Sequence, residues 1–342
     1  MIRSKTVFVV GGGASSELQF PSDAELLARI SQSFDFSRIG TEMQTRDGVF
    51  LLQHLIKLAQ RLSKGEEALR QASERIRIAS KLATSIEAII DQHDNDPLVA
   101  ACGKLGIAHF ICQAEAKSIL RDAPRAPGEL PIQGEDTWLY QLGLLVTAGV
   151  PRSRVEQCLE NLAIINFNYD RSVEHFLPHV LVVAFGMSLQ EAQRLVAQRL
   201  SIIHPFGTVG RLPWQGGENA DVDWGTEQPW NIQNLAMQIR TPGEVMRDQR
   251  ALTNIRALVT GAKRLVLLGF GYQPQNVDML IDYSLSHDPE VLGTLMGVPS
   301  SSHDSVYKML RRKTGIEKDD LITLTNAKCN HLMRDFSLLL ES

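Results

Sequence analysis

Four short clusters of glycines and polar residues have the residue types that phosphate binding and acid–base chemistry require. They are residues 11–16 (GGGASS), 168–170 (NYD), 204–207 (HPFG) and 269–272 (GFGY). Glycine lets the backbone approach a ligand closely, an amide or a carboxylate can hold hydroxyl groups, and histidine has an ordinary pKa suited to proton transfer near neutral pH. We predict that these four clusters belong to one site.

The first cluster follows five β-favouring residues, Thr6–Val10, a run typical of a strand buried on both faces. A helix is expected soon after it, because Ser22 and Glu25 form a capping-box pattern. A strand, a glycine loop and a helix N-terminus together make a cradle for a phosphate or pyrophosphate. A tight structural turn is the alternative, since Ser16 stands where a dinucleotide fingerprint has its third glycine.

The other three clusters also follow strand-like apolar runs, at 163–167, 200–203 and 265–268. In an open parallel sheet, ligands bind beyond the carboxyl ends of the strands, so the clusters should meet there. Each cluster has a purely structural explanation by itself: Asn168–Asp170 as a turn and helix cap, His204 as a loop histidine, and Gly269–Gly271 as a bend. Four of them in one chain favour a shared site.

The predicted fold class is α/β, a Rossmann-like parallel sheet with helices on both faces and a helical insertion. Residues 1–38 and 122–342 should form the sheet domain, to which 291–298 and 321–325 add two weaker strands. Residues 39–121 have almost no strand character and carry apolar residues at helical spacing, so they should form the insertion. Its apolar faces are expected to be core, with a groove for a protein partner or for self-association as the alternative.

Further helices are expected at 137–150, 151–162, 241–261 and 327–340. Between 213 and 229 the chain has no periodicity and carries Trp214 and Trp224, with Trp230 just beyond. We interpret this stretch as a surface loop or, alternatively, as a lid that excludes water from the site.

Composition excludes several classes of protein. The chain has 342 residues and a hydrophobic content of 44%, which is ordinary for a globular protein. Its formal net charge of −4 argues against general binding to nucleic acid or to an anionic membrane. We expect no segment with the length of a membrane span and no targeting peptide, hence a cytoplasmic protein. The four cysteines are scattered without a C-x-x-C pair, which predicts buried thiols and no metal site.

The order and spacing of the four clusters resemble those of the zinc-free, sirtuin-like NAD-hydrolase domains of the kind found in bacterial anti-phage defence. The resemblance covers nearly the whole chain outside the insertion, and its most specific motif is Asn168–Asp170, with Glu174 following. Two positions depart from the family pattern, because Phe206 precedes Gly207 where the family has its histidine and Gly271 replaces a serine. The chain also lacks the four-cysteine zinc ribbon of true sirtuin deacylases, which argues against deacetylation.

The resemblance implies cleavage of the bond between nicotinamide and ribose in NAD, giving nicotinamide and ADP-ribose or its cyclic form. NAD would be the substrate, and no metal would be required. Asn168 would hold the ribose hydroxyls or a water, His204 would accept a proton, and Asp170 would bind the carboxamide. The residues expected to bind the nucleotide are Gly11, Gly12, Gly13, Ala14, Ser15, Gly207, Gly269, Phe270 and Gly271. A non-catalytic sensor of NAD or ADP-ribose and an ADP-ribosyltransferase are the alternatives.

Overall fold

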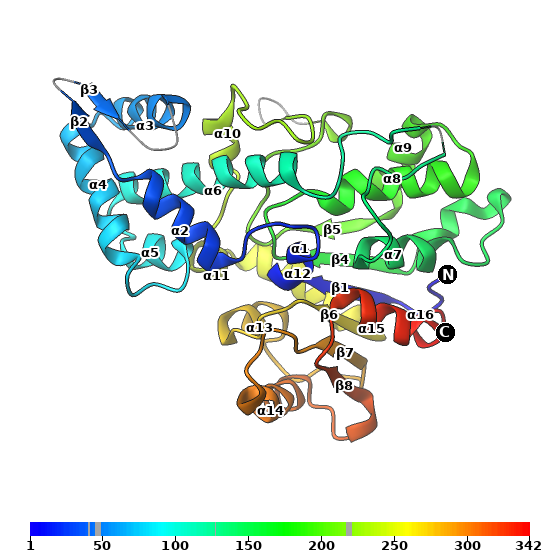
Figure 1. The fold of residues 1–342 in the computed structure, drawn as a ribbon. Helices are drawn as coiled ribbons and strands as arrows, with labels where there is room; N and C mark the ends of the chain where they lie inside the picture. The colour runs from blue at the N-terminus through cyan, green and yellow to red at the C-terminus, as the bar shows by residue number, and fades with distance from the viewer. Residues whose placement is uncertain (40–41, 45–48, 127, 217–220) are drawn as a thin grey trace. The chain divides into compact units, whose positions relative to one another are not determined.

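The computed structural model describes residues 1–39, 42–44, 49–126, 128–216 and 221–342 (Figure 1). Its contacts divide the chain into two compact units. The sheet unit consists of Met1–Gln19, Ile119–Pro205 and Val245–Ser342, and the helical unit consists of Phe20–Ser118 and Phe206–Glu244. Each unit is described by itself.

The sheet unit is built on six parallel strands in the order β5-β4-β1-β6-β7-β8, which confirms the predicted α/β, Rossmann-like class. Strand β1 lies in the centre, pairs with β4 and β6, and is buried along its whole length. A strand buried on both faces needs apolar residues at every position, as its sequence has. The strands are β1 (Thr6–Val10), β4 (Leu162–Asn166), β5 (Ser201–Ile203), β6 (Arg264–Leu268), β7 (Glu290–Thr294) and β8 (Ile322–Thr325).

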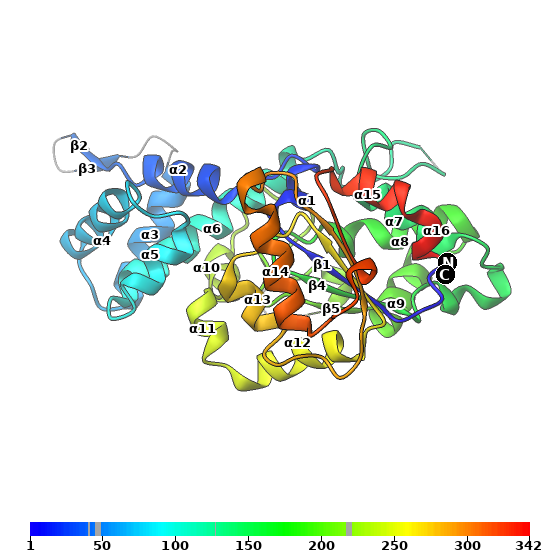
Figure 2. The same ribbon diagram turned by 90° about the horizontal axis from the view of Figure 1, so that it is seen from below.

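The strand order reverses at β1. The chain runs outward through β4 to β5, then returns to the other side of β1 as β6 and continues to β8. Because crossovers between parallel strands are right-handed, this reversal puts the helices of the two halves on opposite faces. Helices α8 (Ser172–Phe185) and α9 (Leu189–Arg199) cover one face, and α13 (Pro274–Leu280) and α14 (His303–Thr314) cover the other (Figures 1 and 2). The loops after β1 and β6 therefore flank a topological switch point.

Three helix predictions for this part of the chain need correction. Of the stretch 151–162, only Arg152–Cys158 forms a 3₁₀ segment, in which Arg154 has non-helical dihedral angles, and Leu162 begins β4. The stretch 241–261 is two helices, α11 (Pro242–Met246) and α12 (Gln249–Gly261), because the Asp248 side chain caps the second one. The last stretch breaks at Phe336 into α15 (Cys329–Asp335) and α16 (Ser337–Leu340). Helix α7 (Trp138–Thr147) lies where one was predicted.

The helical unit is organised around α6 (Pro97–Lys117). This helix is apolar on all sides and packs against the other helices of the unit, which makes it a core helix. The expectation that no segment has the length of a membrane span was wrong, since α6 is the one described helix long and apolar enough, although most of it is buried. The surrounding helices are α2 (Asp23–Ser33), α3 (Val49–Arg61), α4 (Glu66–Ala79), α5 (Ile86–Gln92) and α10 (Ile232–Ala236).

The boundaries of this unit differ from the predicted insertion, 39–121. Helix α2, which begins at the predicted capping box, and residues 206–244 both belong to it. Residues 37–39 and 42–44 form a two-stranded antiparallel pair, β2 and β3, where no strand was expected. In the tryptophan-bearing stretch, Trp224 is buried and Trp230 is exposed, while residues 217–220 lie outside the described part of the chain.

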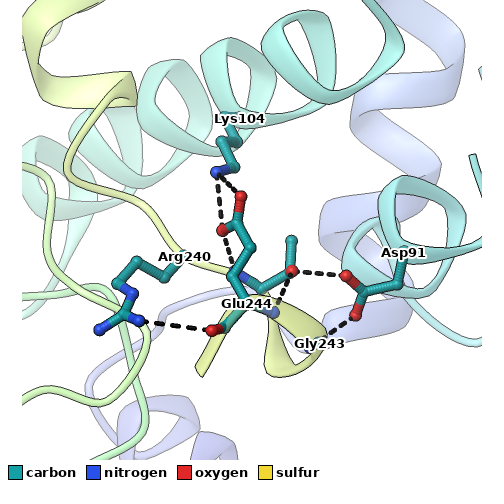
Figure 3. Close-up of polar contacts among 6 residues, drawn as sticks. Asp91, Lys104, Arg240, Gly243 and Glu244 are labelled. Carbon is teal, nitrogen blue, oxygen red and sulfur yellow. Dashed lines mark hydrogen bonds and ion pairs between the residues drawn. The ribbon is translucent and has the colours of Figure 1, made fainter. Parts of the chain in front are cut away.

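A polar cluster ties the end of the 206–244 segment to α5 and α6 (Figure 3). Lys104 Nζ donates to both carboxylate oxygens of Glu244, at 2.7 and 2.8 Å, and the backbone N–H of Thr241 donates to Glu244 Oε2 at 2.9 Å. Asp91 accepts from the Thr241 hydroxyl at 2.5 Å and from the Gly243 N–H at 2.9 Å. Every carboxylate oxygen of this cluster therefore has a donor.

Candidate functional site

The loops after β1 and β6 touch each other through their backbones. A Cβ added at Gly11 would lie 2.7 Å from Gly269 O, and one at Gly13 would lie 2.8 Å from Gly269 Cα. Gly269 has a φ of +57°, and a Cβ there would lie 2.1 Å from Ala14 N. The Gly13 N–H also donates to Gly269 O at 3.0 Å. Packing between the two loops therefore requires glycine at these three positions.

The backbone amides of this turn are largely used within the protein. The N–H groups of Gly11, Gly13 and Ala14 donate to Leu268 O, Gly269 O and Gly11 O. The carbonyl of Ala14 accepts from the indole of Trp138 at 3.0 Å, and helix α1 (Gly12–Ser16) is only about one turn long. For Gly11, Gly13 and Ala14 the geometry is that of a tight structural turn.

Gly12 and Gly271 are different. Both are exposed, neither has a positive φ, and a Cβ at either position would meet no atom within 4 Å. Neither backbone conformation nor packing among the described residues explains their lack of a side chain. Each leaves open backbone surface on one of the two loops at the switch point.

Asn168, Ser15 and Asp170 form a hydrogen-bonded group at the carboxyl ends of β1 and β4. The Asn168 amide donates to Ser15 Oγ at 2.7 Å and to Gly11 O at 3.0 Å. Ser15 Oγ in turn donates to Asp170 Oδ2 at 2.6 Å. Ser15 and Asp170 are buried, whereas Asn168 is partly exposed. The structure thus brings together two of the three residues predicted to be catalytic, Asn168 and Asp170, with Ser15 between them.

His204, the third of them, contacts the backbone of Asn168 and not its side-chain amide. Its Nδ1 lies 3.0 Å from Asn168 O, and its Nε2 lies 2.9 Å from Glu174 Oε1. The side chains of His204 and Glu174 are 9% and 6% exposed. A carbonyl and a carboxylate can only accept hydrogen bonds, so both ring nitrogens face acceptors. This arrangement is satisfied when His204 is an imidazolium and Glu174 a carboxylate.

The electrostatics of the pair agree with this protonation state. Burial alone would lower the pKa of His204, but the charge and hydrogen bond of Glu174 outweigh it and raise that pKa above the ordinary 6.5. Burial alone would raise the pKa of Glu174, but His204 holds it below the ordinary 4.5. Each partner therefore favours the charged form of the other.

Two buried oxygens beside this group have no hydrogen-bond partner among the described residues, Ser172 Oγ and Glu174 Oε2. Both belong to the first turn of α8, which follows Asp170. Buried polar atoms are nearly always paired, with protein or with an ordered molecule. These two oxygens are therefore exceptions to that rule among the described residues.

The loop after β6 is held in place by Tyr272, which lies in the predicted cluster 269–272, and by Thr294, which no sequence pattern singled out. Tyr272 has a φ of +54°, and its hydroxyl donates to Thr294 O at 3.0 Å. Thr294 Oγ1 accepts from the Gly269 N–H at 2.8 Å. Phe270, predicted to bind nucleotide, is buried with its ring edge-on to Phe167 at 5.3 Å. A non-glycine residue at positive φ in this loop indicates stored strain, which is common at binding sites.

Glu174 carried one usable signal, as an acidic residue in a largely apolar helix. Ser172 and Thr294 carried none, because their roles depend on contacts with distant segments. Gly207, predicted to bind nucleotide, belongs to the helical unit. Its φ is +74° and a Cβ there would lie 1.9 Å from Gln238 O, so packing within that unit requires the glycine.

Among the described residues, no group of three or more histidine, cysteine or acidic side chains could hold a metal ion. The four cysteines are buried free thiols. Comparison of this chain with models of known protein families, with curated proteins and with solved structures gives no match in any of the three.

Proposed function

We propose that the sheet unit binds NAD at the carboxyl ends of β1, β4 and β6 and cleaves its nicotinamide–ribose bond. The observation that carries the proposal is the Asn168–Ser15–Asp170 group, which joins the ends of two strands beside the switch point. The open backbone at Gly12 and Gly271 leaves space for a nucleotide there. The resemblance of the motifs to zinc-free, sirtuin-like domains supports the choice of NAD.

The chemistry needs few groups. Departure of nicotinamide leaves an oxocarbenium-like ribose, as in glycoside hydrolysis, and the leaving group is neutral, so no strong acid is required. The partly exposed Asn168 amide would hold a ribose hydroxyl or the attacking water, and Asp170 would contact the carboxamide. His204 would serve as proton acceptor only after giving up one of its two ring protons, since both ring nitrogens carry hydrogen in the arrangement described.

Release of nicotinamide from NAD by the purified chain tests the proposal. Asn168→Ala should lower the rate about 100-fold or more, the size typical of losing one well-placed polar group. Asn276→Ala is the matched control, because this asparagine of α13 bonds only to nearby Gln273. Equal turnover by the wild type and Asn168→Ala would contradict the assignment.

Both ring nitrogens of His204 are already hydrogen-bonded within the protein, which favours a second candidate function. This candidate is a module that binds NAD or ADP-ribose without turnover. Calorimetry that detects NAD binding in preparations releasing no nicotinamide would select it. ADP-ribosyl transfer shares the bond-breaking step, and mass spectrometry of candidate acceptor proteins and nucleic acids would reveal the added group.

The biological setting belongs to the same proposal. We place the protein in the cytoplasm, where it would deplete NAD during phage infection, with the helical unit serving a protein partner or self-association. Cellular NAD measured after infection, with and without Asn168→Ala, tests the first part. Sedimentation of the full chain over a range of concentrations tests self-association.

A further inference from the structure

The Glu174–His204 pair is continuous with the Asn168–Ser15–Asp170 group. His204 Nδ1 donates to the carbonyl of Asn168, and the side chain of that residue continues to Ser15 and Asp170. A continuous chain of hydrogen bonds therefore connects the first turn of α8, the residue that follows β5, and the turns after β4 and β1.

We propose that Glu174 is a positioning residue: its carboxylate holds His204 as an imidazolium, and the imidazolium fixes the Asn168 backbone and with it the amide that faces the ligand. Its relevance to catalysis rests on the proposed function, but the arrangement of the pair does not. A neutral ring would place a lone pair against one of two acceptors, which would weaken a contact to Asn168 O or to Glu174 Oε1.

The charged neighbours of the pair are Asp170 and Arg171, on the segment between β4 and α8. Asp170 favours the imidazolium and Arg171 favours the Glu174 carboxylate. Both neighbours therefore favour the charged forms of His204 and Glu174, as the two partners do for each other. Glu174 also keeps one buried oxygen, Oε2, without a partner in the described part of the chain. A carboxylate retained only to balance charge would be expected to have both oxygens satisfied, as Glu244 does.

The first test needs no substitution. Nitrogen NMR of the histidine rings in the wild-type chain should show His204 protonated at both nitrogens at pH 7. Replacement of Glu174 by Gln removes the charge while keeping the shape, so His204 should lose a proton at a pH lower by about one unit or more, and the Asn168 amide signals should shift. Glu156→Gln, at the exposed pair with Arg199, is the control and should change neither signal.

A neutral His204 ring in the wild type at pH 7, or an unchanged His204 titration in Glu174→Gln, would overturn the proposal. If Glu174→Gln does not fold, the wild-type spectrum decides by itself. NAD calorimetry then separates the two proposals. Loss of about tenfold or more in affinity or turnover, confined to Glu174→Gln, supports positioning of the substrate-binding amide. If Glu174→Gln and the wild type bind NAD equally, the positioning role of Glu174 is wrong and the proposed function stands. If the wild type does not bind NAD, the proposed function is wrong and the arrangement of the pair stands.

Discussion

Glu244 in the helical unit and Glu174 in the sheet unit are both paired with a cation, but their surroundings differ. Glu244 is 40% exposed at its side chain and receives hydrogen bonds from Lys104 and from the Thr241 N–H, so both of its oxygens are satisfied. Glu174 is 6% exposed, bonds to His204 through one oxygen and leaves the other without a partner. The more deeply buried carboxylate is thus the less satisfied one.

This difference in hydrogen bonding distinguishes an ion pair that only stabilises the fold from one that is suited to a ligand-binding site. Leaving a buried charge partly unsatisfied costs stability, so a fold retains such a group where something else depends on it. The Glu244 cluster closes on itself and holds its own segment to α5 and α6. The Glu174 pair extends instead to the group proposed to bind NAD.

The largest expected effect is the removal of one partner of the buried pair. His204→Leu should lower the free energy of unfolding by about 3 kcal/mol or more, because Glu174 is left buried without its counter-charge. Adding Glu174→Met should restore much of that loss, since an apolar pair avoids the desolvation penalty. Urea unfolding of the single and double variants measures both effects. A double variant no more stable than the single one would contradict this view of the pair.

The corresponding change in the helical unit should cost less. Lys104→Met is expected to lower the free energy of unfolding by about 1 kcal/mol, because Glu244 remains accessible to water and keeps its bond to Thr241. Turnover of NAD per folded molecule should not change. Lys308→Met, at an exposed pair on α14, should change stability by less. A loss as large as that of His204→Leu would show that the two pairs do not differ as described.

The buried pair should contribute to the pH dependence of stability together with His175, whose pKa burial lowers to about 3, so that stability falls as pH drops from the ordinary 6.5 toward that value. His204 has a raised pKa in the fold, so its contribution is fully present below its ordinary 6.5 and is lost as pH rises through the folded value. Glu174 has a lowered pKa, so its contribution is present above the ordinary 4.5 and is lost as pH falls through the folded value. Unfolding free energies of the wild type measured from pH 4 to 9 should therefore decline at both ends, and Glu174→Gln should flatten the decline at the alkaline end, whereas His175 still contributes at the acid end.

The smallest effect on stability is expected at the other unpaired oxygen. Ser172→Ala should change the free energy of unfolding by less than about 0.5 kcal/mol, because its hydroxyl has no protein partner to lose. Thr241→Val should cost about 1 kcal/mol, because that hydroxyl donates to Asp91 and accepts from the Glu244 N–H. Thermal unfolding compares the two. If Ser172→Ala also weakens NAD binding, its oxygen belongs to the site.

The gap between prediction and structure is widest at the glycines. Sequence alone grouped Gly11, Gly12 and Gly13 as one phosphate loop, but the first and third are required by contact with Gly269 and only Gly12 is open. A glycine that avoids a clash cannot be told from one that admits a ligand without knowing which distant backbone lies opposite.

Local pattern determined the strands of the six-stranded sheet, most helix starts and the edge of the sheet at which the polar clusters lie. Buried parallel strands require continuous apolar runs, and caps require particular side chains within three residues, so both can be read over short distances. Tertiary structure alone decided that α2 joins the helical unit, that His204 faces Asn168 O and Glu174, and that Glu174 Oε2 has no partner. Protonation and pairing depend on atoms brought together from distant parts of the chain, and no local pattern contains them.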